Sequence, residues 1–191
     1  HLFGILDLLR KTDIEPVVHM ITDGRDTAPK AALGYLKQLE EYLDKLGTGY
    51  IATVSGRYCA MDRARHWDRT ERAWKAMVLG QGVMAATARE AIEGAYTRGE
   101  GDEFIQPTVL AGHRGIASDE AVLFTNFRSD RVRQLSAAFG LDDFDGFDRG
   151  GVCLQKLVCM TEYDARYPFP VLFSPQTPGQ VLAEVLSDAE L

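Results

Sequence analysis

Two spacings of apolar residues alternate along this chain, and each predicts a different kind of element. In residues 31–47, leucines recur every three or four positions and charged residues fill most of the opposite face. This pattern predicts an amphipathic helix, and Gly47 is well suited to its C-terminal end. By contrast, residues 16–22 (PVVHMIT) form a short apolar run led by a proline, which predicts a strand.

The same two patterns continue through the rest of the chain. The segments expected to form strands are 16–22, 49–56, 121–127 and 154–163. The segments expected to form helices are 2–11, 31–47, 68–80, 86–99, 129–139 and 181–191. Residues 101–120 carry scattered glycine and proline and are expected to be irregular. This alternation predicts an α/β fold, a three-layer α/β/α sandwich with a mostly parallel sheet.

Composition narrows the classes of protein to which such a fold could belong. A length of 191 residues suits one domain, and a formal net charge of -7 argues against binding to nucleic acid or to an anionic membrane. No apolar run is long enough to span a bilayer. Cys59, Cys153 and Cys159 show neither disulfide nor metal spacing, so we expect a cytoplasmic protein with no metal site in this chain.

Polar segments that contain arginine follow three of the predicted strands. They are DGRD (23–26), GRYCAMDR (56–63) and NFRSDR (126–131). In open α/β sheets, ligands bind beyond the carboxyl ends of parallel strands. We therefore expect the three segments to meet on one side of the sheet and to form a shared site.

An acidic chain that gathers arginines in these loops points to a small anionic ligand. A guanidinium group offers a planar fork of N–H donors that matches the oxygens of a phosphate or a carboxylate. If a helix begins at residue 129, Arg128 and Arg131 project from its first turn, where backbone N–H groups also favour an anion. Spacing alone leaves ligand binding and solvated surface charge equally open. Arg57 and Arg128 are expected to be exposed and without structural partners.

Other polar residues give weaker indications. Asp23 and Asp26 suit turn or capping roles, because aspartate accepts backbone N–H bonds there, and direct chemistry is the less frequent alternative for Asp26. His19 lies within an apolar strand and is expected to be a core or sheet residue, whereas His113 lies in a loop and is expected to be solvated. The sequence contains no His-x-x-His or Cys-x-x-Cys spacing, Walker loop or nucleophile elbow.

Taken together, several motifs resemble one enzyme family. They are DGRDT (23–27), ATVSGRYCAMDR (52–63), HWDR (66–69), FTNFRSDRVRQL (124–135) and VCMTEYD (158–164). In order and spacing they are similar to cofactor-independent phosphoglycerate mutase over nearly the whole chain. The resemblance implies an alkaline-phosphatase-like domain with two Mn²⁺ ions and a serine nucleophile, and a transferase domain inserted within it.

By the same resemblance, residues 1–191 are expected to be most of the inserted transferase domain, with the phosphatase-like domain absent from the chain. The family's SDGGVHSH segment, which supplies a substrate-binding histidine, is expected just before His1. A further active-site lysine is expected beyond the last residue. The metal ligands are likewise expected outside this chain, and the choice between Mn²⁺ and Mg²⁺ stays open.

The resemblance also implies which residues contact substrate. The implied substrate-binding residues are Arg25, Asp26, Arg57, Arg63, Arg128 and Arg131. Asp26 is in addition the implied catalytic residue, which would bind the glycerate hydroxyls and take part in acid–base work. The chain departs from the family pattern at Ala28, Cys59 and residues 64–66, and none of these departures removes an arginine of the set.

The implied reaction interconverts 3-phosphoglycerate and 2-phosphoglycerate, a step of glycolysis and gluconeogenesis, through a phosphoserine in the other domain. Two alternatives stay open: a non-catalytic anion-binding module, and a metal-dependent phosphatase of the same superfamily. The expected partners are 2- or 3-phosphoglycerate and the phosphatase-like domain of the same protein. The protein is expected to be a monomer without nucleic-acid or membrane partners, and this chain alone is expected to be inactive.

Overall fold

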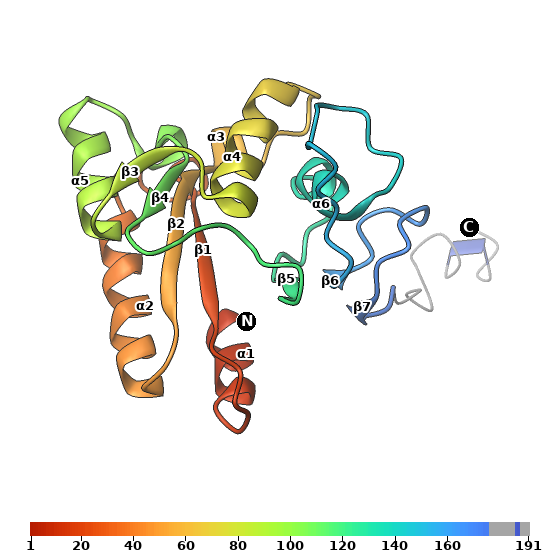
Figure 1. Cartoon of the computed structure of the whole chain (residues 1–191), viewed down its shortest axis with the longest axis horizontal. Coiled ribbons are helices and arrows are strands. Elements are labelled where there is room, and N and C mark those ends of the chain that lie inside the picture. The colour runs from red at the N-terminus through yellow and green to blue at the C-terminus, as the bar shows by residue number, and fades with distance from the viewer. Residues whose placement is uncertain (176–185, 188–191) are drawn as a thin grey trace.

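The computed structural model describes residues 1–175 and 186–187, which form two β-sheets with helices around them (Figure 1). The strands are β1 Val17–Thr22, β2 Tyr50–Gly56, β3 Val83–Ala85, β4 Thr108–Leu110, β5 Val122–Phe124, β6 Leu157–Thr161 and β7 Val171–Phe173. The helices are α1 Leu2–Leu9, α2 Ala32–Leu46, α3 Arg57–Ala60, α4 Trp67–Leu79, α5 Ala88–Thr97, the 3-10 helix η1 Asp102–Phe104 and α6 Arg133–Gly140. The helix expected over 181–191 lies outside the described residues, apart from 186–187.

The first sheet has the strand order β1-β2-β4-β3. β1 runs parallel to β2, with Val17 opposite Tyr50 and Thr22 opposite Gly56. β4 is antiparallel to β2, and β3 is parallel to β4. Because β1 and β2 end at the same edge, the polar segments that follow these two strands begin side by side.

Helices cover both faces of the first sheet. α2 and α5 pack on one face, where Leu36, Val54 and Ile92 have no exposed surface. α4 packs on the other face. The alternation of side chains along β1 follows this layering, because Met20 contacts the α2–α5 side and Ile21 contacts the cluster that contains α4.

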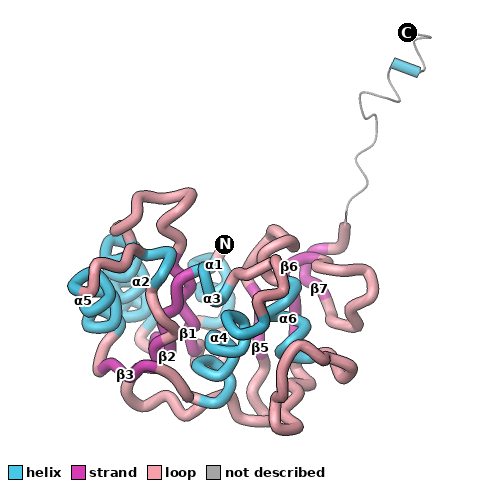
Figure 2. Tube along the Cα trace, turned by 90° about the horizontal axis from the view of Figure 1, so that it is seen from above, coloured by secondary structure: helices cyan, strands magenta, loops and turns pink. Residues whose placement is uncertain are grey.

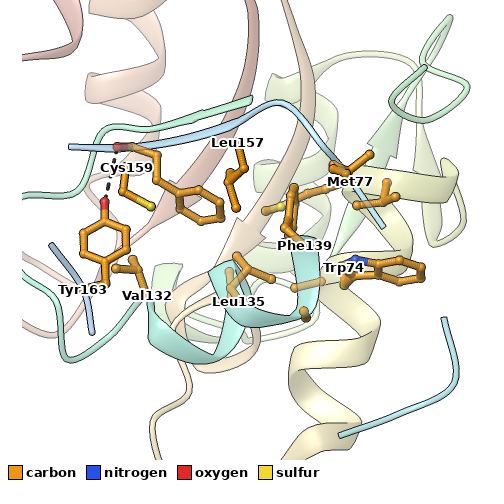
Figure 3. Packing of buried hydrophobic residues seen from close by; sticks show 14 of the residues in the cluster. Trp74, Met77, Val132, Leu135, Phe139, Leu157, Cys159 and Tyr163 are labelled. Atoms are coloured by element: carbon orange, nitrogen blue, oxygen red, sulfur yellow. Dashed lines mark hydrogen bonds between the residues drawn. The ribbon is translucent and has the colours of Figure 1, made fainter. Parts of the chain in front are cut away.

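The second sheet, β5-β6-β7, is parallel throughout, and its core is shared with α4 and α6. Figure 3 shows Trp74 and Met77 of α4 near Leu135 and Phe139 of α6, with Leu157 of β6 in the same cluster. Burying one such side chain stabilises the fold by roughly 1.5–3 kcal/mol. Seen from above, α4 lies between β1 and β5 (Figure 2). This shared core fixes the loops of one sheet relative to those of the other.

The predicted α/β class and mostly parallel pairing are confirmed, and the structure adds three differences. The strands form two sheets rather than one. β3, β4 and β7 were not predicted, because each has only three residues, and β4 lies inside the segment expected to be irregular. Finally, α6 begins at Arg133 rather than at residue 129, because residues 129–132 form a turn closed by the bond from Val132 N to Ser129 O.

The end of α2 agrees with the sequence pattern. Gly47 adopts the left-handed conformation with φ 76°, and its N–H donates to the Leu43 carbonyl. Leu36, Leu39 and Leu43 are buried along one stripe of the helix. In the part of the chain that the structure describes, no helix combines the length and the apolar character needed to cross a membrane.

Candidate anion-binding site

The structure brings the three arginine-bearing loops together, as predicted. Arg57 at the end of β2 contacts the loop after β1, through Asp23 and Asp26. Arg63 Nη1 donates to Asp130 Oδ2 at 2.8 Å, which joins the loop after α3 to the loop after β5. Arg131 Nη1 donates to the Met61 carbonyl at 3.3 Å and reinforces that junction. Loops from both sheets therefore meet in one place.

Arg57 lies inside this junction rather than on its surface. Only 7% of Arg57 is exposed, and its Nη1 donates to Asp23 Oδ1 and, at 3.1 Å, to Asp26 Oδ2. Burial acts to lower the pKa of Arg57, but the hydrogen bonds to both carboxylates outweigh burial and raise it. The expectation of an exposed arginine without structural partners is therefore wrong for Arg57.

The DGRD loop packs closely against the turn at η1, and Gly24 makes this close approach possible. Thr22 Oγ1 donates to the Asp102 carbonyl at 2.7 Å. Gly24 has φ 68°, and a Cβ added there would lie 2.7 Å from the backbone nitrogen of Glu103. Asp23 Oδ1 accepts the N–H groups of Arg25 and Asp26, so the predicted turn role of Asp23 is confirmed. Only glycine fits at position 24 without displacing the turn.

A second arginine group is exposed and shares one carboxylate. The side chains of Arg63 and Arg128 are 56% and 71% exposed, and both approach Asp130, Arg128 through its Nε at 3.9 Å from Oδ1. Burial acts to raise the pKa of Asp130, but the bond from Arg63 and the charge of Arg128 lower it overall. One carboxylate thus faces two guanidinium groups, which leaves positive charge in excess at this point.

Arg131 adds to the same excess of positive charge. Its pKa is lowered, first by burial and then by the positive charges of Arg57, Arg63 and Arg25. Three other predicted arginines thus lie within electrostatic range of Arg131 and repel its charge. An anion placed among them would relieve the repulsion, which is the physical signature of an anion-binding site.

The expectation that Arg128 and Arg131 project from the first turn of a helix is wrong. α6 begins at Arg133, so both residues precede the helix, Arg128 in the loop and Arg131 in the turn of residues 129–132. These guanidinium groups reach the junction from the loop itself. The prediction that they share a site with Arg57 and Arg63 does not depend on the helix start and stands as a prediction.

Of the two histidine expectations, the one for His19 is correct and the one for His113 is wrong. His19 lies within β1, as expected of a sheet residue, and is half-buried. Its Nδ1 pairs with Thr53 Oγ1 at 2.9 Å, and its pKa is lowered to about 3 by loss of solvation and then by the nearby His113. His113 is not solvated, because it is 8% exposed and its Nε2 donates to the Met77 carbonyl at 2.9 Å. Neither residue touches the arginine loops. Within residues 1–175 and 186–187, no group of three or more His, Cys, Asp or Glu side chains could hold a metal ion.

Three buried polar residues behind the site were missed by sequence reasoning. Asp102 accepts the N–H groups of Ala31 and Ala32 at 2.8 Å each and supports the start of α2. Asp62 and Gln134 are hydrogen-bonded to each other at 2.9 Å. Asp62 stands within the GRYCAMDR motif, which was a usable signal. The backbone N–H groups that Asp102 binds and the partners of Gln134 lie far away in sequence, so no local sequence signal indicated the roles of these two residues.

Comparison with known proteins gives consistent matches. The family model described as the BPG-independent PGAM N-terminus matches residues 1–165. The 2,3-bisphosphoglycerate-independent phosphoglycerate mutase of Myxococcus xanthus is 45% identical over 193 residues, covering 98% of this chain and 38% of that protein. The protein of the same name from Moorella thermoacetica is 46% identical over 197 residues, covering 100% of this chain and 38% of that protein.

A solved structure matches the whole fold. The phosphoglycerate mutase of Leishmania mexicana, solved at low cobalt concentration, superposes with a TM-score of 0.87 at 30% sequence identity. The match covers 100% of this chain and 38% of that chain. The chain therefore spans less than half the length of the curated and structural relatives that it matches.

Proposed function

Since this chain belongs to the family of BPG-independent phosphoglycerate mutases, we propose that it forms most of the substrate-binding domain of such a mutase. The complete protein would interconvert 3-phosphoglycerate and 2-phosphoglycerate by phosphoryl transfer. One observation carries this proposal: hydrogen bonds made by Arg57, Arg63 and Arg131 join the three arginine-bearing loops in one place. A ligand with both a carboxylate and a phosphate matches such a group of arginines.

Within this proposal, the arginines have different roles in binding the ligand. Arg63 and Arg128 have largely exposed side chains and would bind the phosphate or the carboxylate directly, together with Arg131 and Arg25. Arg57 uses its Nη1 for Asp23 and Asp26, so it would contact ligand through its remaining guanidinium N–H groups or by exchanging one of these two bonds. Firm contacts to the carboxylate would keep the glycerate bound between the two transfer steps, so that it can present either hydroxyl group. Positioning of this kind is a large source of rate enhancement.

Asp26 is the residue that we assign to the glycerate hydroxyls. Its side chain is 67% exposed, and its Oδ2 accepts a hydrogen bond from Arg57 Nη1 at 3.1 Å, which orients the carboxylate. A charged carboxylate can accept a hydrogen bond from a hydroxyl group and can take its proton as the oxygen attacks. This assignment makes Asp26 the catalytic residue of the domain.

The phosphoryl-transfer groups are assigned to the remainder of the protein. The family resemblance implies a serine nucleophile and Mn²⁺, but the described residues offer no cluster of metal ligands. The described part of the chain therefore does not fit a resident metal ion. The partner of this domain would be the phosphatase-like domain of the same polypeptide, in a monomeric, cytoplasmic enzyme without nucleic-acid or membrane contacts.

A mutase assay of two proteins tests the proposed function. We predict that the full-length protein converts 3-phosphoglycerate to 2-phosphoglycerate and that residues 1–191 alone do not, with or without Mn²⁺. In an NMR titration of residues 1–191 with 3-phosphoglycerate, the signals that shift should cluster near Arg25, Arg63, Arg128 and Arg131. Turnover by residues 1–191 alone would contradict the two-domain proposal. Release of inorganic phosphate without isomerisation by the full-length protein would indicate a phosphatase instead.

A further inference from the structure

A buried carboxylate lies next to one of the exposed arginines and organises its loop. Asp62 precedes Arg63, and its side chain is only 6% exposed. Its Oδ2 accepts the backbone N–H groups of Ala64 at 2.9 Å and His66 at 3.0 Å, while Oδ1 pairs with His66 Nδ1 at 2.9 Å. Burial alone would raise the pKa of Asp62, but its bonds to the His66 side chain and to Gln134 lower it overall. Asp62 thus acts on its own loop rather than facing a ligand.

Gln134 connects this loop to α6 and to α4. It is the second residue of α6 and is 8% exposed. Its Nε2 donates to Asp62 Oδ2 at 2.9 Å and to Thr70 Oγ1 at 3.1 Å, and its Oε1 accepts the Arg65 N–H at 2.6 Å. All polar atoms of the Gln134 amide group are therefore engaged by segments far from it in sequence.

The loop that Gln134 holds has a strained backbone. Arg65 has φ 60°, and within the described residues it is the single non-glycine residue with positive φ. Such a conformation is uncommon for a residue with a side chain, and it persists where surrounding bonds hold it. The Arg65 N–H is bound by Gln134 Oε1, so the bond and the strain occur at the same residue.

Each member of the pair is close in sequence to one arginine of the site. Arg63 follows Asp62 directly, and Arg131 lies three residues before Gln134. We propose that Asp62 and Gln134 are positioning residues that hold Arg63 and Arg131 at the spacing needed to bind the two ends of one phosphoglycerate. This inference rests on the proposed function and extends it to residues that do not touch substrate. Like charges tend to separate, so two guanidinium groups need such a fixed support.

The variant Gln134→Glu tests this role with little change in size. The carboxylate that it introduces can still accept the Arg65 N–H, but it cannot donate to Asp62, and two carboxylates at this separation repel each other. The matched control is Gln38→Glu, the same change at an exposed position of α2. Gln134→Met, which removes all three side-chain hydrogen bonds without charge repulsion, provides a second variant.

Two measurements on the full-length protein separate positioning from general stability. The first is NMR of arginine-labelled protein: Gln134→Glu should shift the Arg65 amide signal and the Nε–Hε signals of Arg63 and Arg131, and Gln38→Glu should not. The second is KM for 3-phosphoglycerate, measured in wild-type and Arg63→Ala backgrounds. We expect Gln134→Glu to raise KM about tenfold in the wild-type background and by a smaller factor in the Arg63→Ala background, where only Arg131 remains to be displaced.

The possible outcomes each decide the question. Unmoved arginine signals, or an equal rise of KM in both backgrounds, would overturn the inference. Loss of the native spectrum in both Gln134 variants would also overturn it, because the pair would then hold the fold rather than the arginines. If the wild-type protein shows no mutase activity, the proposed function fails, and the arginine signals still decide whether Gln134 positions Arg63 and Arg131.

Discussion

The two halves of the candidate site use the same residue type in opposite ways. On the side of the first sheet, Arg57 is almost fully buried and is bound by Asp23 and Asp26. On the side of the second sheet, Arg63 and Arg128 share the single carboxylate of Asp130 and remain largely exposed. We refer to these as the buried half and the exposed half.

The difference between the two halves explains how an acidic chain can hold several arginines close together. In the buried half, two carboxylates surround one guanidinium group, so its charge is compensated and its bonds fix the DGRD loop. In the exposed half, positive charge exceeds negative charge, so an incoming anion meets guanidinium groups whose N–H donors are still hydrated. The buried half shapes the site, and the exposed half is assigned to binding.

The largest effect is expected from breaking the buried half with Arg57→Ala. Removing one partner of a buried ion pair leaves the other charges uncompensated, and here two carboxylates lose their shared donor. Because Asp26 is well exposed, we expect a loss of about 2 kcal/mol in the free energy of unfolding. We also expect at least about a hundredfold loss of kcat/KM in the full-length protein, since the DGRD loop carries Asp26. Urea unfolding and a mutase assay measure the two losses.

A smaller and more selective effect is expected in the exposed half from Arg128→Ala. One hydrogen bond to a charged group contributes roughly 1.5–3 kcal/mol, so kcat/KM should fall about ten- to a hundredfold. The free energy of unfolding should change by less than about 0.5 kcal/mol, because Arg128 is 71% exposed and its nearest carboxylate atom lies 3.9 Å away. Arg128→Ala therefore serves as the stability control for Arg57→Ala. Equal unfolding free energies for the two variants would remove the contrast between the halves.

The sequence predicted the positions of the arginines better than their burial, for physical reasons. β1, α2 and β2 have long apolar patterns, so their ends and the polar residues that follow them were visible in advance. Burial of Arg57 depends on how closely the turn at η1 approaches the end of β2. A Cβ at Gly56 would lie 2.3 Å from the Glu103 carbonyl oxygen, and no local pattern encodes that contact.

The same limit applies to the supports of the loops. Asp62 and Gln134 are 72 positions apart in sequence, and Asp102 is 71 positions from Ala31, whose N–H it accepts. The start of α6 was also misplaced, because SDRV has the composition of a helix start but forms a turn closed at Val132. Local patterns thus reveal which residues can bind an anion, while tertiary contacts decide which of them are free to do so.

The smallest effect is expected from acid acting on Asp23 in the buried half. Burial acts to raise the pKa of Asp23, but its bonds with Arg57 and with the backbone of Asp26 and Arg25 lower the pKa overall. A carboxyl group whose pKa is lower in the folded state contributes stability above its unfolded value, about 3.9, and loses that contribution as pH falls through the folded value. At pH 7 the free energy of unfolding should therefore be higher for wild-type protein than for Asp23→Asn by about 1 kcal/mol or less, since a third of the Asp23 side chain is exposed. The difference should shrink below about pH 4, where Asp23 becomes protonated and resembles the amide. Urea unfolding between pH 3 and pH 7 measures this difference in the free energy of unfolding. Asp13→Asn is the exposed control. A difference that stays constant down to pH 3 would show that the charge of Asp23 does not hold Arg57.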